Sequence, residues 1–489
     1  MKKRILCILL AALCVLPSAA CASSGKPEDT SSAADTTAPS DTAPSSDTSA
    51  PAETDDGMLH DSLGPADFEQ AEYIIFGGSN RATKAVTAAD QNGEPINDAQ
   101  YTARTNVEDR FNVRISYVDV GDNDTAVAVM TKQLVDAGDD TYAIGYGQDG
   151  NTINLSLQGY LYNLHTIEQF SFDEPWWSDA TKELAFGDHY YAASSFLSYY
   201  CLYMTKLLVV NKQIAADRGI EIPYDKVFDG TWYLDDFAQF ISSATDDLNG
   251  DGVMDANDLY GLSYQPGSLT TFQSSMGVTI YSKGEDNMPY LDFDLERALE
   301  YLGVMEPLLE KNGYKDSTSY GAPFFSQGRA LAAYCMLREV CTIIRDTDIS
   351  YGFLPAPKLN ENQKDYKTAS VDILWSMPRI HKAKVDMIGT VTEALSCQHY
   401  NLVRPAFFET TMKGKLSDSP NDAKVLDMIP ATLTIDFGYA YYQVITPIQT
   451  LLDLANKTKV GNLASVYKKL SGPLEKYLGD IAATFEKMP

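Results

Sequence analysis

The sequence predicts an α/β protein with two lobes, and three observations lead to this fold class. Predicted strands and helices alternate along the chain, which is typical of largely parallel sheets with right-handed crossovers. The alternation continues on both sides of residues 186–212, where we expect the chain to pass from one lobe to the other. The chain has 489 residues, 44% of them hydrophobic, which is enough to build two cores.

The first residues predict a signal peptide over residues 1–21. Three basic residues at positions 2–4 precede an apolar stretch at 5–16, which is too short to span a bilayer. The sequence Ser18-Ala-Ala-Cys21 follows and resembles a bacterial lipobox, although Ser18 stands where leucine is usual. We expect Cys21 to be acylated and to become the first residue of the mature chain. The alternative is a plain secretory signal that is cut nearby, with Cys21 incidental.

A flexible linker is expected over residues 22–60. Residues 22–57 consist mainly of Ser, Thr, Ala, Pro, Asp and Glu, with no aromatic or large aliphatic side chain, so they cannot bury a core. As a random coil, this segment has a root-mean-square reach of about 35 Å. That reach suits a tether that holds a folded body away from a membrane.

The charge and the cysteine content exclude several classes of site and partner. The formal net charge is −29, and removing the three basic residues of the signal peptide gives −32. Such acidity argues against nucleic acid and against electrostatic binding to anionic lipid. Four cysteines remain in the body, at positions 201, 335, 341 and 397. They are too few and too scattered for a disulfide scaffold, and their spacing does not match a zinc site.

The body begins with strands and helices in alternation. The predicted strands are residues 73–76, 113–118 and 142–146, and the predicted helices are residues 97–110 and 124–137. Polar loops follow the first and last of these strands, at residues 77–80 and 147–151, and such loops line the cleft of open α/β sheets. Where the chain changes lobe, residues 207–210 form a buried strand, and Asn211 stands at the N-cap of the next helix.

Eight short segments of the body follow one another in a recognisable order. They are residues 97–113, residues 159–164, Pro175-Trp-Trp177, Val210-Asn-Lys212, residues 231–237, residues 325–330, residues 407–415 and Asp436-Phe-Gly438. Together they span most of residues 66–445. In this order they resemble the extracellular solute-binding proteins of bacterial ABC importers, the large type that mostly serves sugars.

This resemblance implies two α/β lobes that face each other across a cleft in a periplasmic-binding-protein-like fold. It implies three crossings of the chain between the lobes, near residues 199–206, near residues 369–376 and within residues 413–430. It assigns residues 66–199 with 370–425 to the first lobe and residues 200–369 with 426–489 to the second. The second lobe then ends in helices with an apolar stripe, which consists of Leu474, Tyr477, Leu478, Ile481 and Phe485.

Residues 247–258 have the spacing of an EF-hand calcium loop. Oxygen-bearing side chains stand at loop positions 1, 3, 5, 9 and 12, glycine stands at position 6, and position 7 offers a backbone carbonyl. The predicted Ca²⁺ ligands are Asp247, Asn249, Asp251, Val253, Asp255 and Asp258. Asp258 stands where the longer Glu is usual, and residues 260–262 break any exit helix. We therefore expect a structural calcium site without a complete EF-hand; the alternative is a polar turn that binds no metal.

The ligand cleft implied by the resemblance is lined by loops at the carboxyl ends of strands and by residues near the crossings. The predicted ligand-binding residues are Ser79, Asn80, Arg81, Gln148, Asp149, Trp176, Trp177, Tyr199, Tyr200, Tyr264, Trp375 and Tyr439. Sugars offer apolar faces to aromatic rings and hydroxyl groups to polar side chains, so we expect a mono- or oligosaccharide. Arg81 could instead bind a carboxylate, which keeps amino acids and peptides as the second ligand class. For any single aromatic residue here, packing in the core is the simpler alternative.

The expected function is therefore binding and delivery rather than catalysis. We expect a monomer that is lipid-anchored on the extracellular face of the cytoplasmic membrane and passes a captured solute to the permease subunits of an ABC importer. The sequence contains no nucleophile elbow, no zinc-binding helix motif and no phosphate loop. Two alternatives remain: a secreted glycoside hydrolase that uses two carboxylates, and a surface glycan-adhesion protein that binds polymers on an open face.

Overall fold

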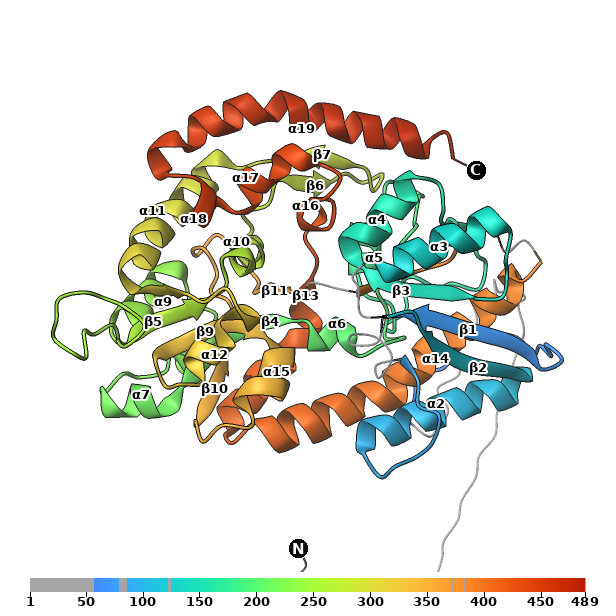
Figure 1. Ribbon diagram of the computed structural model, residues 1–489, viewed down its shortest axis with the longest axis horizontal. Coiled ribbons are helices and arrows are strands. Elements are labelled where there is room, and N and C mark those ends of the chain that lie inside the picture. Colours follow the sequence, from blue (N-terminus) through green and yellow to red (C-terminus); the bar gives the residue numbers. More distant parts are fainter. Residues whose placement is uncertain (1–56, 79–85, 122–124, 371–372, 381–382, 489) are drawn as a thin grey trace, which may run out of the picture. The chain divides into compact units, whose positions relative to one another are not determined.

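The computed structural model describes residues 57–78, 86–121, 125–370, 373–380 and 383–488 (Figure 1). The predicted lipidation site Cys21 and the predicted ligand residues Ser79, Asn80 and Arg81 lie outside these residues. Within them, no helix is both long enough and apolar enough to cross a membrane.

A four-stranded sheet forms the core of the first lobe. Its strand order is β12-β3-β1-β2, with bounds β1 (Ala71–Gly77), β2 (Val113–Asp119), β3 (Ile144–Gln148) and β12 (Ile373–Ser376). Strand β1 runs parallel to β2 and β3, whereas β12 runs antiparallel to β3. Tyr73, Ile75 and Phe76 of β1 are fully buried, as expected for a central strand whose two faces are both covered.

Helices cover this sheet on both faces (Figure 1). They are α2 (Pro95–Phe111) and α14 (Val385–Pro405), which pack against each other, and α3 (Ala126–Ala137) and α4 (Asp149–Leu157), which pack against β3. Proline in the first turn of α2 costs no hydrogen bond, and Asn112 ends the helix in the left-handed conformation with φ 50°. The Tyr73 hydroxyl lies 2.6 Å from the Thr392 hydroxyl, which links β1 to α14.

A five-stranded sheet forms the core of the second lobe. Its strand order is β10-β4-β9-β5-β8, with bounds β4 (Lys206–Asn211), β5 (Tyr260–Tyr264), β8 (Gly313–Lys315), β9 (Ala330–Met336) and β10 (Tyr351–Leu354). Strand β5 is parallel to β8 and β9, but β4 is antiparallel to both of its neighbours. The Asn211 side chain accepts from the Ile214 N–H at 3.0 Å, which confirms the predicted N-cap of α7 (Lys212–Asp217).

Shorter elements complete the chain between and after these sheets. They are α5 (Ala180–Glu183), α6 (Tyr200–Tyr203), α8 (Tyr224–Phe228), α9 (Leu234–Ser242), α10 (Leu269–Ser275), the hairpin β6 (Tyr281–Lys283) and β7 (Pro289–Leu291), α11 (Leu295–Asn312), α12 (Ala322–Phe325), α13 (Leu337–Glu339), α15 (Pro420–Thr432), α16 (Phe437–Ala440), α17 (Gln449–Leu452), α18 (Leu454–Lys457) and α19 (Leu463–Phe485). Helices α9 and α11 pack together against β5, and α15 packs against β10.

Three segments of the chain meet at Ser370. Its backbone forms an antiparallel bridge with Thr205, and its N–H donates to the Thr434 carbonyl at 3.0 Å. Its hydroxyl donates to the Cys201 carbonyl at 3.2 Å. Beside it, β11 (Thr368–Ala369) pairs in parallel with β13 (Leu433–Thr434). Strand β4 begins directly after Thr205 and β12 shortly after Ser370, so the chain passes between the sheets where the first two crossings were predicted.

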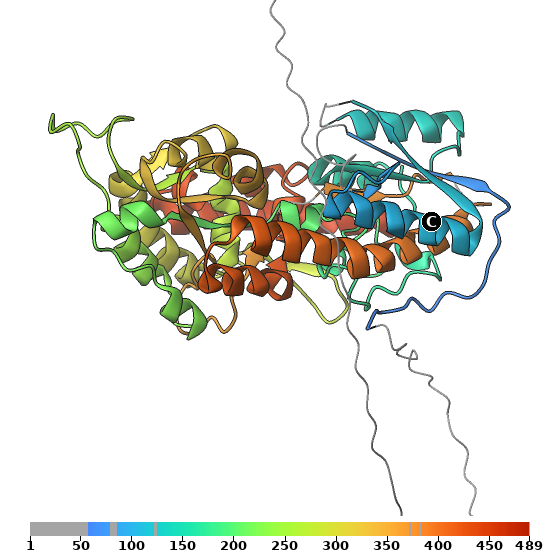
Figure 2. The ribbon, with the colours of Figure 1, turned by 90° about the horizontal axis from the view of Figure 1, so that it is seen from below.

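The third passage between the sheets is helical. Helix α14 continues into residues 406–416, which form a π-helix and contact both α2 and α15 (Figures 1 and 2). This passage overlaps with the predicted third crossing at residues 413–430. The lobe limits given above, residue by residue, stay a prediction.

The C-terminal helix α19 contacts elements of both lobes. The predicted stripe is confirmed, because Leu474, Leu478, Ile481 and Phe485 are buried and Tyr477 is partly buried. Near the start of α19, the Tyr467 ring centroid lies 4.8 Å from that of Phe293. At its end, the Phe485 ring lies 5.3 Å from Phe186 of the first lobe.

The β6–β7 hairpin also reaches the first lobe. The Gly187 N–H donates to the Asn287 carbonyl at 3.2 Å, and the Asn287 amide donates to the Gly187 carbonyl at 3.0 Å. The Lys283 ammonium donates to the Ala185 carbonyl. The hairpin and α19 therefore add two contacts between the lobes besides the three crossings.

Asp422 anchors α15 to the second sheet. Its side chain is fully buried and accepts from the Lys212 ammonium at 2.6 Å, the Tyr224 hydroxyl at 2.6 Å and the Phe353 N–H at 3.0 Å. The Ser419 hydroxyl donates to it at 2.7 Å. Burial of a carboxylate is tolerated here because each of its oxygen atoms has hydrogen-bond donors.

We expect Asp422→Ala to lower the free energy of unfolding by roughly 3–5 kcal/mol, because it leaves buried donors and the Lys212 charge without their acceptor. Urea-induced unfolding measures this change. Asp427→Ala on the same helix is the matched control, since Asp427 is exposed and pairs with Lys413 at 2.5 Å. Equal effects of the two variants would show that Asp422 is not an anchor.

Candidate functional site

The carboxyl ends of the parallel strands of both lobes lie close to the crossings. Residue Ile373 at the start of β12 pairs with Gln148 at the end of β3, and Lys206 at the start of β4 pairs with Met336 at the end of β9. Charged side chains gather at these ends. They are Asp149 after β3, Lys206 in β4, and Arg338 and Glu339 after β9. Ligands of open α/β sheets bind at such edges, so this strand-end cluster is the first part of the candidate site.

Lys206 is the most deeply buried charge of the cluster. Its side chain is 2% exposed, its ammonium donates to the Thr271 hydroxyl at 3.0 Å, and it lies 5.0 Å from the centre of the Tyr320 ring. Burial lowers the pKa of Lys206 to about 7, although the carboxylates of Glu339 and Asp149 act to raise it. A lysine in this setting gains from any ligand that brings hydrogen-bond acceptors to it.

Glu339 is paired on one side only. The Arg338 guanidinium donates to its Oε1 at 2.6 Å, whereas its Oε2 is buried and has no hydrogen-bond partner among the described residues. Burial raises the pKa of Glu339, and the Arg338 charge opposes this shift. An acceptor in this state favours a ligand that donates a hydrogen bond.

Gln148 and Asp149 stand at the junction of β3 and α4, as the strand-end argument predicted. Asp149 is 7% exposed and accepts from the Gly150 N–H at 2.7 Å, and Gln148 accepts from the Asn151 amide at 2.8 Å. The charge of Asp149 contributes, after burial, to a raised pKa of the Tyr439 hydroxyl. Tyr439 therefore remains a neutral hydrogen-bond donor next to the strand-end cluster.

Tyr439 also lines a pocket of about 240 Å³, which is the second part of the candidate site. The lining residues are Gly267, Thr270, Tyr439, Tyr442, Gln449, Leu452, Asp453 and Lys457. The rings of Tyr439 and Tyr442 have centroids 5.7 Å apart and are tilted by 33°. Asp453 is 8% exposed, and burial raises its pKa while the Asn456 amide, which donates to it at 2.7 Å, opposes the shift.

This tyrosine pocket combines two aromatic rings with a carboxylate, an ammonium and a hydroxyl group. Aromatic faces pack against apolar C–H surfaces, and the polar groups supply both donors and acceptors. The arrangement is suited to bind a small polar solute that also has an apolar face. Among the described residues, it contains no activated nucleophile next to a base.

The structure places Trp176 and Trp375 in the core, which contradicts the expectation of an open face for these two residues, whereas Trp177 lines a separate cavity of about 370 Å³. Trp176, Trp177 and Trp375 are 1%, 5% and 0% exposed. The indole N–H groups of Trp176 and Trp177 each donate to Glu393 at 2.9 Å, and that of Trp375 donates to the Ser195 hydroxyl at 3.1 Å. The rings of Trp176 and Trp375 are therefore committed to packing, and the indole N–H groups of all three residues are engaged in internal hydrogen bonds.

The remaining predicted tyrosines differ in their surroundings. Tyr264 is fully buried, so its ring has no face open to a ligand, which corrects the expectation for this residue. Tyr200 is 5% exposed and packs within the crossing segment, with its ring 6.1 Å from that of Tyr199. Tyr199 is half-buried and stacks on Phe407 at 5.1 Å. Of the predicted aromatic residues, Tyr439 alone lines the pocket described above.

Several residues of the candidate site were not predicted from the sequence. They are Lys206, Tyr320, Arg338, Glu339, Tyr442 and Asp453. Two of them leave a sequence signal: Lys206 is a charged residue at the start of an otherwise apolar strand, and Tyr442 belongs to the run Tyr439-Ala-Tyr-Tyr442. The others are distinguished only by what surrounds them in the fold.

The predicted calcium loop is held by its own hydrogen bonds. Asp258 accepts from the N–H groups of Leu248 and Asp255 at 3.0 and 2.8 Å, and Asp247 accepts from those of Gly250 and Gly252 at 2.7 and 2.8 Å. Asn249, Asp251 and Asp255 each accept from an N–H group two residues ahead, and Val253 is exposed. In the described part of the chain, no three His, Cys, Asp or Glu residues are grouped so as to hold a metal ion.

Calcium binding by this loop stays a prediction of the sequence. If it binds to the folded chain, the thermal unfolding midpoint must rise when free calcium exceeds its dissociation constant. We expect a higher midpoint in millimolar calcium than in excess chelator, and we expect Asp247→Asn to abolish the difference. An identical midpoint under both conditions would identify the loop as a turn.

Glu393 makes the stability of the tryptophan core depend on pH. Its side chain is 1% exposed, and burial raises its pKa from the ordinary 4.5 to about 7, against the opposing effect of the two indole donors. Between these values the folded state binds a proton more readily than the unfolded chain. The contribution of Glu393 to the free energy of unfolding therefore falls as the pH rises from about 4.5 to about 7.

We expect Glu393→Gln to remove this contribution, so that the wild-type chain loses stability relative to the variant over that pH range. Denaturant unfolding of both chains at closely spaced pH values measures the difference. Parallel pH profiles would show that the carboxyl group does not have a raised pKa.

The comparisons with known proteins agree with the two-lobed fold. No protein-family model and no curated protein matches the chain. The structure of UgpB from Mycobacterium tuberculosis in complex with glycerophosphocholine aligns with a TM-score of 0.53 and 15% identity, over 83% of this chain and 98% of that chain. The cyclic alpha-maltosyl-1,6-maltose binding protein from Arthrobacter globiformis aligns with a TM-score of 0.54 and 13% identity, over 84% of this chain and 100% of that chain. The chain therefore shares the two-lobed α/β fold of these two structures.

Proposed function

We propose that this chain is a solute-binding protein that captures a small hydroxylated solute, a mono- or oligosaccharide, for an ABC importer. The observation that carries the proposal is the tyrosine pocket, where the rings of Tyr439 and Tyr442 stand beside Asp453, Lys457 and Thr270. The pocket adjoins a strand-end cluster in which Lys206 favours acceptors and Glu339 favours donors. A polyhydroxylated ligand supplies both kinds of group together with apolar C–H faces.

The fold supports the same proposal. One similar structure is named for its binding of a cyclic maltosyl-maltose, and the other is a complex with glycerophosphocholine. Both printed ligands carry several hydroxyl or ester oxygens. We infer that the lobes close on the solute as a clamp, since a ligand that contacts both lobes favours the arrangement in which it makes all of its contacts.

Binding without catalysis is the simpler use of these residues. Glycoside hydrolysis needs two carboxyl groups on opposite sides of one bond. The acidic residues closest to the pocket and the cluster are Asp453, Asp149 and Glu339, and Glu339 is engaged by Arg338. Incubation with oligosaccharides, followed by product analysis, tests this choice, because release of shorter sugars would establish a hydrolase.

We expect Tyr439→Ala to weaken saccharide binding by roughly 30- to 100-fold with little loss of folding stability. A sugar face against one ring removes about 50 Å² of apolar area from each partner, which contributes on the order of 2–3 kcal/mol. Calorimetry with a panel of mono- and oligosaccharides measures the affinity. Tyr290→Ala is the matched control, because Tyr290 is 49% exposed and lies outside the pocket.

Trp177→Ala gives the opposite pattern in the same assay. This substitution should lower the free energy of unfolding by roughly 3–5 kcal/mol. It should not change the saccharide affinity of the chain that remains folded. If an amino acid or peptide binds and no saccharide does, the proposed ligand class is wrong, although the two-lobed fold stands.

We also propose that the chain is anchored by a lipid on Cys21, faces the outside of the cytoplasmic membrane and acts as a monomer with the permease subunits. The sequence Ser18-Ala-Ala-Cys21 and the linker behind it support the anchor. We expect Cys21→Ser to release the protein from cells into the medium. Mass spectrometry that finds an unmodified mature N-terminus at another residue would contradict this expectation.

A further inference from the structure

A second polar cavity of about 340 Å³ lies between elements of both lobes and shares no lining residue with the tyrosine pocket. Its walls come from α5 in the first lobe, from α10 and the β6–β7 hairpin in the second, and from the segments around β11 and β13. The lining residues are Glu183, Ser274, Thr279, Tyr281, Ser282, Lys283, Lys367, Thr434, Ile435, Asp436 and Phe437.

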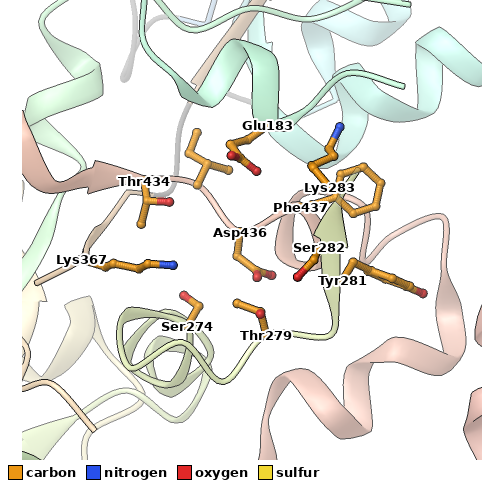
Figure 3. A pocket seen from close by; sticks show the side chains of 11 residues that line it. Glu183, Ser274, Thr279, Tyr281, Ser282, Lys283, Lys367, Thr434, Asp436 and Phe437 are labelled. Atoms are coloured by element: carbon orange, nitrogen blue, oxygen red, sulfur yellow. The ribbon is translucent and has the colours of Figure 1, made fainter. Parts of the chain in front are cut away.

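Polar groups from these separate elements converge on the cavity. Figure 3 shows the carboxylates of Glu183 and Asp436 and the ammonium of Lys367 directed into the same space, with the hydroxyl groups of Thr279 and Thr434 at its edge. The side chains of Glu183 and Lys367 make no hydrogen bond or ion pair within the part of the chain that the structure describes, although the charge of Glu183 acts on Lys283 and that of Lys367 acts on Asp436. Convergence of unengaged groups from distant parts of the sequence is a property of binding cavities.

Two other charges of the cavity are already engaged by the protein. The Lys283 ammonium donates to the Asn287 carbonyl at 3.1 Å as well as to Ala185, and one Asp436 oxygen accepts from the Tyr439 N–H at 2.6 Å. Burial raises the pKa of Asp436 to about 6 and lowers that of Lys283 to about 8. Both charged forms therefore lack hydration that a polar ligand would restore.

The balance of charge defines the class of ligand. The cavity contains two carboxylates and two ammonium groups, so it offers no net charge to an ion. The groups that can still bind a ligand are the carboxylate oxygens of Glu183 and Asp436 as acceptors, the Lys367 ammonium as a donor, and hydroxyl groups that both donate and accept. An amino acid requires an ammonium group that is free to pair with its carboxylate, whereas the Lys283 ammonium already donates to two protein carbonyls and Lys367 is exposed, with a long side chain that is free to move.

We propose that this cavity is a second binding site, separate from the tyrosine pocket, for a neutral polyhydroxylated compound of monosaccharide size. Its hydroxyl groups donate to Glu183 and Asp436 and accept from Lys367 and Thr434. Glu183 belongs to the first lobe and Thr279 to the second, so a compound that contacts both resists movement of these walls relative to each other. The cavity shares no lining residue with the tyrosine pocket, although Asp436 caps the helix that contains Tyr439.

The test is calorimetry on the mature chain with D-glucose, D-galactose, D-xylose, ribitol and myo-inositol, and with glycine and L-glutamate as the amino-acid arm. The pocket variant is Glu183→Gln with Lys367→Met. The matched control is Glu361→Gln with Lys364→Met, which removes the same charges from exposed positions close to Lys367 in sequence.

The expected result is that at least one of the five polyhydroxylated compounds loses tenfold or more in affinity in the pocket variant and none in the control, since each lost bond to a charged group costs about tenfold. Three results would overturn the proposal. The first is that none of the five compounds loses affinity in the pocket variant. The second is that glycine or glutamate, and not a polyhydroxylated compound, loses affinity in the pocket variant. The third is that Tyr439→Ala abolishes binding of the same compound that the pocket variant affects. In the third case the binding belongs to the tyrosine pocket.

Discussion

The direction in which the chain enters each sheet constrains the whole structure. The carboxyl ends of the parallel strands of both lobes lie near the crossings. A segment that arrives from the other lobe therefore enters the sheet at these ends, and the strand that it forms runs antiparallel to its neighbours. Strands β12 and β4 are the first strands after a crossing, and both run antiparallel to their neighbours. Ser370 joins the first two crossings to each other and to the segment at Thr434. Beside these contacts, the ends of β3 and β9 bring Asp149 and Glu339 close to the buried Lys206.

The same geometry explains the electrostatics of the site. A strand that begins at the junction between the lobes begins in the interior, and Lys206 is the residue that falls there. Its burial would be costly without the carboxylates of Glu339 and Asp149, which come from different lobes. A charge that depends on both lobes is sensitive to any change in their separation. The polar character of the site is therefore a consequence of topology and not of local sequence alone.

The fold could be predicted from the sequence, but most residues of the candidate site could not. Alternation of strands and helices predicted the lobes, and strand ends predicted Gln148 and Asp149, because both depend on local pattern. Trp176 and Trp375 were misjudged because their acceptors, Glu393 and Ser195, lie 217 and 180 positions away along the chain, and no local pattern reveals them. Asp453 and Tyr320 are likewise defined by long-range packing. Residues that are charged or aromatic in sequence become functional only through neighbours that the fold supplies.

Helix α19 and the β6–β7 hairpin connect the two lobes at positions away from the crossings. The three crossings alone would form a hinge between the lobes. Helix α19 packs on Phe293 near its start and on Phe186 at its end, so it spans this hinge and restrains its opening. The stiffness of the hinge is then set in part by the last turns of the chain. A tag or fusion placed directly after α19 loads this helix, so the apparent affinity of a tagged chain reflects the helix as well as the binding site.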